Sequence, residues 1–464
     1  MIKKHWGLIV IILVAIFWRF WNFDNRWVLN QDQARDAIIG LYALRHNIWP
    51  EIGSPSSAGP FNFGPWYDWL IMFWEKVIPT INGPWIGFAM MSVVSVILYY
   101  LTGGWIAGIL AAVAVGQVEN APDMLNTVIV GFSSGLAWWG TKKLIKTDKW
   151  KWGIVVGAGV GLSINFHFQS LGLLAILVAI IIFDIKKIFG LGLGLLISFL
   201  PLIVFDIKRN GMWINSVIEY YTVGVNRFYV PVRWLTEIRD FWPQLFGSIT
   251  VGINNFGYIW LILGLILMIK KTKVDRFWWI LMVIFLIDIF LMRNYKGVRS
   301  REYMIVFHGM IILICSWIVG EYYKLNKYVG LLILGIVVSL AGVKNRQNIK
   351  QNPSQAQAVL EIKEELENGL KPFRTKDDNK IYFEQYQQSD MISMPMFYLY
   401  YRENRVGNAG TKISFCDGNR YICPKGEIIN KNKYFIYINS RESWDKLTGE
   451  NIYDRLMVNY GVKN

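Results

Sequence analysis

Charged residues are scarce in this sequence. Asp, Glu, Lys and Arg make up 17% of its 464 residues, whereas a soluble globular chain carries about a quarter. This scarcity excludes an ordinary soluble protein. The net charge of +15 is therefore read first as a signal of membrane topology. Because no DNA- or RNA-binding motif accompanies the charge, we expect no nucleic-acid partner.

Cysteine is also rare, and its three copies constrain the function little. Cys315 lies inside an apolar run, where simple packing is its expected role. Cys416 and Cys423 flank a segment that reads as a hairpin turn, and in an oxidising exterior they either pair or stay free, because pairing depends on geometry. Without His or Cys partners at ligand spacing, the two argue against a zinc site.

Apolar and aromatic residues are abundant, at 54% and 16% of the chain, with 22 Trp. Several runs reach the roughly 20 residues that cross a bilayer. The first, "MIKKHWGLIVIILVAIFWRFW", has Lys3 and Lys4 before it and no small-residue cleavage site after it, so we expect an uncleaved span with a cytoplasmic N-terminus. Further runs lie at about 84–101, 105–118, 124–141, 152–166, 169–184, 188–205, 253–269, 277–292, 303–320 and 327–342. The sequence predicts an α-helical polytopic protein of the plasma membrane with about eleven transmembrane helices.

The distribution of basic residues agrees with this predicted membrane topology. Alternating spans place four Lys-rich segments inside, at 142–151, 184–187, 270–276 and 323–327, which is the positive-inside pattern. The outer segments then hold Asp32, Asp36, Glu119, Asp123, His167, Asp206, Arg209, Arg299 and Arg301. Since the outer cations are mostly Arg, which binds phosphate in a bidentate manner, we expect an anionic ligand at the outer face.

Two further parts flank the spans. The first outer loop, 23–83, contains "GPWYDWLIMFWEKVI" at 64–78, which reads as a helix lying in the membrane interface. Residues 345–464 read as a small α+β domain outside the membrane, separate from a transmembrane domain at 1–344. Its helix at 355–369 places Val359, Ile362 and Leu366 on one face, and "KIYFEQY", "KISFCDGNRYIC" and "KYFIYINS" read as short strands.

A polar cluster follows the first span. Asp32 and Asp36 are one helical turn apart and share a face, with Arg35 beside them. A solvated loop helix with a local ion pair is the plain interpretation. The Gly- and Pro-rich stretch at 53–65, which gives a stiff path, favours side chains that are held in place for function.

These residues resemble the GT-C glycosyltransferases, which include the dolichyl-phosphate-mannose protein mannosyltransferases and the lipid A aminoarabinose transferases. "DQARDA" at 32–37 is similar to their Asp-Glu-Ala-Arg-Tyr-Ala loop motif, and "IGSPSSAGPFNFGPWYDWL" to their Pro-Pro-Leu-Tyr-Tyr-Trp-Leu element. "GLSINFHFQSLGLL", "LPLIVFDIKRN" and "GVRSREYMIVFHGMIIL" are similar to later motifs of bacterial members, in the same order. The chain departs from the family pattern at Gln33, Asp36 and Gly64-Pro65, which bears on the sugar and the acceptor more than on the reaction class.

The resemblance implies a reaction at the outer membrane face. A sugar passes from a polyprenyl-phosphate carrier to an acceptor hydroxyl on a lipid, glycan or protein, with inversion at the anomeric carbon. Asp32 is the expected general base. Lys296, Arg299, Arg301 and Tyr303 are the expected phosphate cradle, with Arg35 and Asp36 as further donor contacts. No cofactor is required; two nearby acids suit Mg²⁺ or Mn²⁺, and a metal-free reaction is equally coherent.

Other polar residues have two readings each. His167 and Gln169 either contact sugar or phosphate or simply end a span. Asp206 and Arg209 either bind donor or form an interfacial ion pair. Asp123 either caps a helix or touches substrate. Asp288 lies inside a span, where an acid is a functional candidate by default, or it pairs with a neighbouring helix.

Two other function classes stay open. A transporter or flippase of an anionic lipid or glycan would carry polar residues near mid-membrane in two related halves. The sequence shows one mid-span acid and no halves, and its polar residues gather at one face, which favours an enzyme. A non-catalytic membrane subunit with a binding C-terminal domain would leave Asp32 dispensable.

Overall fold

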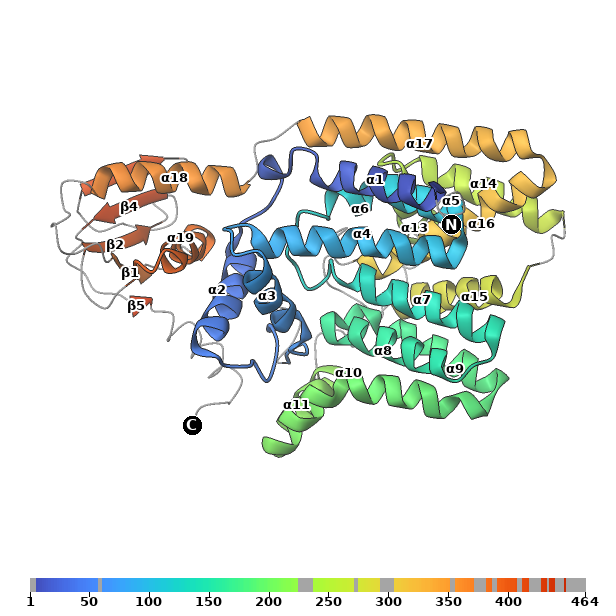
Figure 1. Cartoon of the computed structure of the whole chain (residues 1–464), viewed down its shortest axis with the longest axis horizontal. Helices are drawn as coiled ribbons and strands as arrows, with labels where there is room; N and C mark the ends of the chain where they lie inside the picture. The colour runs from blue at the N-terminus through green and yellow to red at the C-terminus, as the bar shows by residue number, and fades with distance from the viewer. Residues whose placement is uncertain are drawn as a thin grey trace. The chain divides into compact units, whose positions relative to one another are not determined.

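The computed structural model describes residues 6–56, 61–223, 237–270, 274–292, 304–350, 355–370, 381–385, 390–406, 411–416, 427–431, 434–438 and 446–447. The chain forms two compact units (Figure 1). We call the first, Met1–Trp21, Glu51–Trp66 and Phe88–Gln351, the bundle unit. The second, Asn22–Pro50, Tyr67–Gly87 and Asn352–Asn464, is the sheet unit. Parts of the first loop thus cluster with the C-terminal segment, while the predicted division at residue 344 stays a prediction.

Helices build most of the described part of the bundle unit, because its apolar runs satisfy their backbone groups internally in this way. The α-helices are α1 Trp6–Phe20, α4 Gly83–Gly103 (which begins in the sheet unit), α5 Trp105–Val113, α6 Val115–Glu119, α7 Val130–Thr147, α8 Lys151–Phe166, α9 Leu174–Phe183, α10 Ile188–Lys208, α11 Met212–Val223, α13 Trp242–Thr250, α14 Phe256–Ile269, α15 Arg276–Met292, α16 Ile305–Leu325 and α17 Lys327–Lys350. Two 3-10 helices, η3 Phe168–Leu173 and η4 Ile185–Lys187, and a π-helix, η6 Glu237–Phe241, complete the set. α16 is the most buried of the long apolar helices.

Helix forms at each predicted apolar run, so the helical fold class is confirmed. Four helices within the described residues are long and apolar enough to cross a membrane by length and composition, and four shorter apolar helices accompany them. The run at 105–118 is not one helix, because it breaks at Ala114 between α5 and α6. The total number of spans stays a prediction.

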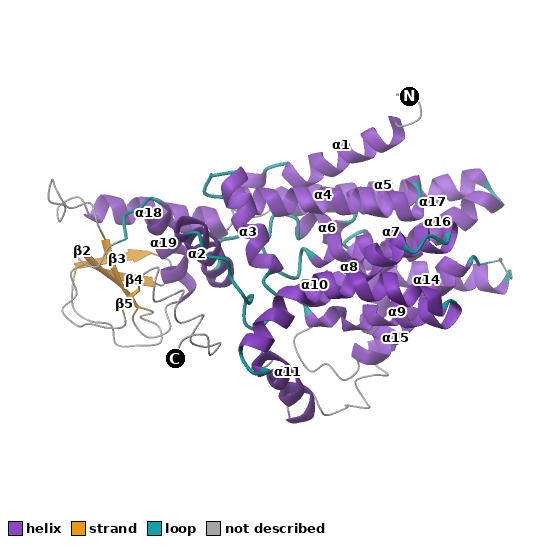
Figure 2. Ribbon diagram, turned by 60° about the horizontal axis from the view of Figure 1, so that its bottom comes forward, coloured by secondary structure: helices purple, strands orange, loops and turns teal. Residues whose placement is uncertain are grey.

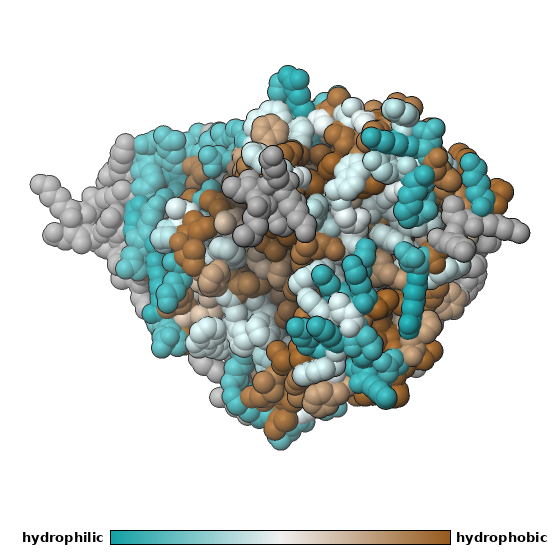
Figure 3. All heavy atoms as spheres, turned by 45° about the vertical axis from the view of Figure 1, so that its right-hand side comes forward, coloured by the Kyte–Doolittle hydropathy of each residue, from teal (hydrophilic) through white to brown (hydrophobic). Residues whose placement is uncertain are grey.

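The Lys-rich segments 142–151, 184–187 and 323–327, with the described ends of 270–276, lie at one end of the bundle unit (Figure 1). The Lys187 ammonium is 2.8 Å from Asp148 Oδ1, which joins the connection after α7 to the one after α9. The Arg276 guanidinium lies 3.7 Å from the centre of the Phe183 ring, which adds the start of α15. Figure 3 turns this end forward and shows extended hydrophilic side chains over it, with exposed apolar side chains beside them. The predicted grouping of these segments is therefore present in the fold.

Glycine allows close packing between α8 and α10. A Cβ added at Gly157 would lie 2.1 Å from the Leu191 carbonyl oxygen, and one at Gly194 would lie 2.2 Å from the Ile154 carbonyl oxygen. Small residues of this kind let helix backbones approach in membrane proteins. The two helices therefore pack backbone against backbone.

A fully buried arginine connects α1 to the rest of the bundle unit. Arg19 donates hydrogen bonds to the Ser92 hydroxyl at 2.9 Å and to the carbonyl oxygens of Ala111 and Ala112 at 3.2 Å each. These two carbonyls belong to the last turn of α5, where the helix dipole favours a cation. The charge that ends the first apolar run therefore caps another helix.

The sheet unit combines helices with one five-stranded sheet (Figure 2). Its first-loop part holds the 3-10 helix η2 Phe23–Asn25, α2 Gln31–His46 and most of α3 Trp66–Val77. Its C-terminal part holds α18 Gln355–Leu370, β1 Ile381–Gln385, α19 Asp390–Arg402, β2 Thr411–Cys416, β3 Glu427–Lys431, β4 Tyr434–Ile438 and β5 Lys446–Leu447. The strand order is β3-β4-β2-β1-β5, in which only β1 and β2 are parallel.

The parallel pair explains the position of α19. Parallel neighbours need a crossover connection, and α19 is that connection between β1 and β2. It packs against β1 and α18 and also against α2. The helix predicted at 355–369 forms, and a strand forms in the described part of each predicted segment at 380–386, 412–423 and 433–440, whereas α19, β3 and β5 were not predicted. Val359, Ile362 and Leu366 are all buried, as expected.

Candidate active site

The N-terminus of α2 presents Asp32. The Asn30 side chain accepts a hydrogen bond from the Gln33 N–H at 2.9 Å and so caps the helix. Asp32 follows in the first turn, where the helix dipole favours a carboxylate. Its side chain is 62% exposed, so a hydroxyl group can approach it.

Arg35 links the two carboxylates of α2. Its Nη1 is 2.8 Å from Asp32 Oδ1, and its Nε is 2.8 Å from Asp36 Oδ1. Asp36 is only 5% exposed, so one end of the pair is buried and the other faces outward. Arg35 therefore fixes the orientation of Asp32, and its expected contact with a donor phosphate stays a prediction.

A second buried acid lies next to this cluster on α3. Asp68 is 1% exposed, and its Oδ1 has no hydrogen-bond partner among the described residues. Burial, together with the charge of Asp36, raises the pKa of Asp68 well above its ordinary value, although Arg35 opposes this shift. Burial, and then the charges of Asp36 and Asp68, likewise raise the pKa of Tyr67, which hydrogen-bonds to Asp36.

From the sequence, Asp68 was expected only as part of an interfacial helix and was not among the candidate site residues. The helix exists as α3, but its acids Asp68 and Glu75 are 1% and 3% exposed and face protein. They share this face with Ile71 and Met72 at helical spacing. An acid on an otherwise apolar face was the signal that could have identified Asp68.

His167 and Gln169 lie in the bundle unit, where α8 ends and η3 begins. His167 Nδ1 accepts a hydrogen bond from the Gln169 N–H at 3.4 Å, and its ring stacks on Phe63 at 5.2 Å. Burial lowers the pKa of His167 to about 4, so the ring is neutral near pH 7 and offers hydrogen bonds rather than charge. Both amide atoms of Gln169 are buried without a hydrogen-bond partner among the described residues.

Asp206 has a structural role at the end of α10. Its Oδ1 accepts hydrogen bonds from the N–H groups of Trp213 at 2.7 Å and Ile214 at 3.2 Å, and so it caps α11. Its described contacts are thus those of a helix cap, and the ion pair with Arg209 stays a prediction. A role of Asp206 or Arg209 in donor binding stays a prediction.

The Gly- and Pro-rich stretch of the first loop packs on the same region of the bundle unit. The Gly64 N–H donates to the Asn165 carbonyl oxygen at 2.9 Å, and the Phe61 ring stacks on Phe168 at 4.6 Å. A Cβ at Gly64 would lie 1.8 Å from Asn165 Oδ1. A side chain at this position would therefore clash with the Asn165 side chain.

Asp288 is buried in α15, with both carboxylate oxygens unpartnered among the described residues. A Cβ added at Gly172 in η3 would lie 1.4 Å from Asp288 Oδ1, so the carboxyl group lies directly against the η3 backbone. The expected pairing with a neighbouring helix is not found in the described part of the chain.

The predicted phosphate cradle lies outside the described residues, since these exclude Lys296, Arg299, Arg301 and Tyr303. The same holds for Cys423, so its pairing with Cys416 stays a prediction. In the part of the chain that the structure describes, no group of three or more His, Cys, Asp or Glu residues is placed to hold a metal ion.

Comparison with known proteins identifies the fold. No protein-family model and no curated protein sequence matches the chain. Its structure is similar to that of ArnT from Cupriavidus metallidurans bound to undecaprenyl phosphate, with a TM-score of 0.61 and 11% identity over 94% of this chain and 99% of that chain. The structure of the same protein in the apo state is similar too, with a TM-score of 0.56 and 10% identity over 95% of this chain and 98% of that chain. The chain has the GT-C fold.

The GT-C fold spans nearly the full length of both chains, so it includes the bundle unit and the sheet unit. It agrees with the fold that the resemblance at 32–37, 52–70, 161–174, 200–210 and 297–313 implies. The sequence identity is too low for any motif to be placed from the match alone, and the roles of individual residues rest on the contacts described above.

Proposed function

We propose that this protein is an integral-membrane glycosyltransferase that moves a sugar from a polyprenyl-phosphate-linked donor to an acceptor hydroxyl, with Asp32 as the general base. The observation that carries the proposal is an exposed carboxylate, held by Arg35 at the start of α2, in a chain with the GT-C fold. The similarity to a structure of ArnT bound to undecaprenyl phosphate supports this class of donor.

The proposed reaction is a single displacement. The acceptor hydroxyl oxygen bonds to the anomeric carbon while its proton passes to Asp32, and the bond from that carbon to the phosphate oxygen breaks. The sugar is transferred with inversion, and polyprenyl phosphate leaves with the bonding electrons. Asp32 accepts the proton from its exposed position.

The leaving phosphate gains charge, which nearby cations stabilise. From the sequence pattern we propose a hydrogen bond from Tyr303 and this role for the three cations Lys296, Arg299 and Arg301. Their charge removes the need for a proton donor to the leaving group, and neither a cofactor nor a divalent cation is required by the scheme. A lipid, glycan or protein hydroxyl would serve equally as acceptor.

The proposal is tested by turnover of purified protein with a panel of polyprenyl-phosphate-linked pentoses and hexoses. Asp32→Asn should lower kcat by roughly two to four orders of magnitude, the usual effect of losing a general base. Asp24→Asn, at another exposed position of the sheet unit, is the matched control and should keep wild-type turnover. Full activity of Asp32→Asn would refute the assigned base, whereas absence of turnover in the wild-type protein would favour a non-catalytic subunit.

We propose that the site faces the outside of the plasma membrane. The Lys-rich segments, such as 142–151, share one end of the bundle unit and should be cytoplasmic. Cysteine accessibility labelling in intact cells should then modify positions in 345–464 and spare those in 142–151. The opposite labelling pattern would invert the topology.

One observation suits a transporter or flippase instead. The unpartnered Asp288 carboxyl in α15 is the kind of intramembrane acid that marks transport paths. Translocation of a fluorescent polyprenyl-phosphate sugar across proteoliposomes, abolished by Asp288→Asn and unaffected by Asp32→Asn, would establish that function in place of transfer.

A further inference from the structure

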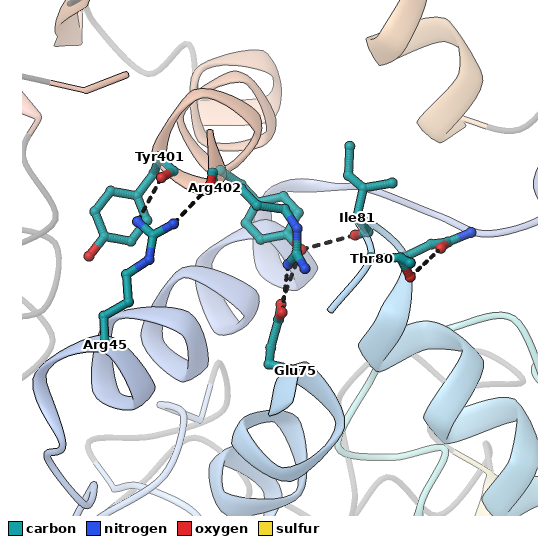
Figure 4. Close-up of polar contacts among 8 residues, drawn as sticks. Arg45, Glu75, Thr80, Ile81, Tyr401 and Arg402 are labelled. Carbon is teal, nitrogen blue, oxygen red and sulfur yellow. Dashed lines mark hydrogen bonds and ion pairs between the residues drawn. The ribbon is translucent and has the colours of Figure 1, made fainter. Parts of the chain in front are cut away.

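The C-terminal helix α19 is joined to α3 by a buried ion pair (Figure 4). Arg402 Nη1 lies 2.6 Å from Glu75 Oε2, with side-chain exposures of 15% and 1%. The Tyr398 hydroxyl accepts from Arg402 at 3.0 Å and lies 3.2 Å from Glu75 Oε1 and 2.9 Å from the Ile81 carbonyl oxygen. Since a buried carboxylate is costly without a partner, the position of Glu75 depends on Arg402.

The same helix is joined to α2 from its other side. Arg45, in the last turn of α2, donates from Nη1 and Nη2 to the carbonyl oxygens of Tyr401 and Arg402, both at 2.8 Å. These are the last carbonyls of α19, which a cation caps favourably. The Arg45 guanidinium also lies 4.7 Å from the centre of the Tyr401 ring, as Figure 4 shows.

A third set of contacts leads from α19 to the turn that carries Asp32. The Tyr398 ring packs against Trp85, with ring centres 6.0 Å apart. The Trp85 indole N–H lies 2.7 Å from Gln33 Oε1 and 2.6 Å from the Val28 carbonyl oxygen. Gln33 is 1% exposed and follows Asp32 directly. Trp85 therefore contacts both the first turn of α2, through Gln33, and α19, through Tyr398.

We propose that Arg402 is a positioning residue for the transfer reaction, which acts through Glu75, Tyr398 and Trp85 to set the orientation of Asp32. This rests on the proposed function. If Arg402 has this role, the C-terminal segment contributes to catalysis and is not a separate binding module. The donor and acceptor do not need to touch α19 for this effect.

The test compares two arginines of the sheet unit that make similar ion pairs. Arg402 pairs with Glu75 on α3, whereas Arg405 pairs with Glu367 on α18 at 2.6 Å. In the full-length protein, Arg402→Ala should lower kcat roughly 10- to 100-fold with an unchanged KM for donor, because misorientation of a reacting group slows chemistry more than binding. Arg402→Lys should recover part of the loss, and Arg405→Ala should keep the wild-type kcat.

A second readout does not depend on activity. Backbone hydrogen exchange at 31–36 should be roughly tenfold faster in Arg402→Ala than in Arg405→Ala, because the turn loses its support. If Arg402→Ala does not fold, Trp85→Phe keeps a smaller aromatic ring at this position, removes the indole N–H and should give the same two effects. Unchanged exchange at 31–36, or equal losses of kcat in Arg402→Ala and Arg405→Ala, would overturn the proposal. Absence of turnover in the wild-type protein would instead refute the proposed function, and exchange would still decide the positioning role.

Discussion

Asp32 and Asp36 share one arginine, and replacing each by Asn should separate catalysis from stability. Asp32 is 62% exposed and Asp36 is 5% exposed, while Arg35 lies 2.8 Å from both. Asn keeps the shape of the side chain and removes its charge. The two substitutions therefore make the same chemical change at opposite ends of one ion-pair network.

The expected magnitudes follow from exposure. An exposed ion pair contributes at most about 1 kcal/mol, so Asp32→Asn should hardly change the free energy of unfolding. A buried hydrogen bond between charged groups contributes about 1.5–3 kcal/mol, so Asp36→Asn should lose an amount of this size. The effects on rate should be reversed: Asp32→Asn should lose about two to four orders of magnitude in kcat, and Asp36→Asn far less.

The assay pairs turnover of a polyprenyl-phosphate sugar with thermal unfolding in the same detergent. Both variants should bind the donor, since neither change removes the predicted phosphate cradle. The reasoning fails if Asp36→Asn is the less active of the two, or if Asp32→Asn is the less stable. The first result would show that the wrong carboxylate has been assigned as base, and the second that exposure does not decide which ion pair stabilises the fold.

Three further predictions follow from single contacts. Because burial raises the pKa of Asp68, its protonated form stabilises the fold at low pH, and this stability is lost as pH rises above about 4. With rising pH the thermal midpoint of Asp68→Asn should therefore fall less steeply than that of the wild-type protein, and an unchanged slope would contradict the prediction. Gly64→Ala should destabilise the protein, since its Cβ would lie 1.8 Å from Asn165 Oδ1, whereas Gly335→Ala meets nothing within 4 Å and should not; equal thermal midpoints would contradict the packing. Arg301→Lys should weaken donor use and Arg301→Ala should do so more strongly, and wild-type affinity for polyprenyl phosphate in both would remove this residue from the site.

Local spacing made the helical part of the fold and one ion pair predictable. Apolar runs gave the helices, and the spacing of Asp32 and Arg35 in a helix gave their contact. The interior face of α18 was also evident from Val359, Ile362 and Leu366. In each case the partners lie within a few turns of one another, so the pattern is visible in one short window.

Contacts between distant segments were not predictable. Glu75 and Arg402 are 327 residues apart, and nothing near either one indicates the other. α19 was missed because it contains Pro395, which ordinarily interrupts a helix. Asp206 was not expected to cap a helix, because the helix that begins at Met212 was not foreseen from the sequence.

Arg19 has a consequence for how the chain is made. Its acceptors at Ala111 and Ala112 lie 92 and 93 residues later in the sequence, and a growing chain is synthesised from its N-terminus at about 5–20 residues per second. For several seconds the guanidinium therefore has none of the α5 carbonyls to bind, and a charge within hydrocarbon is costly. We expect the newly made first helix to rest with Arg19 at the headgroups and to settle beside α5 only after that helix has been inserted.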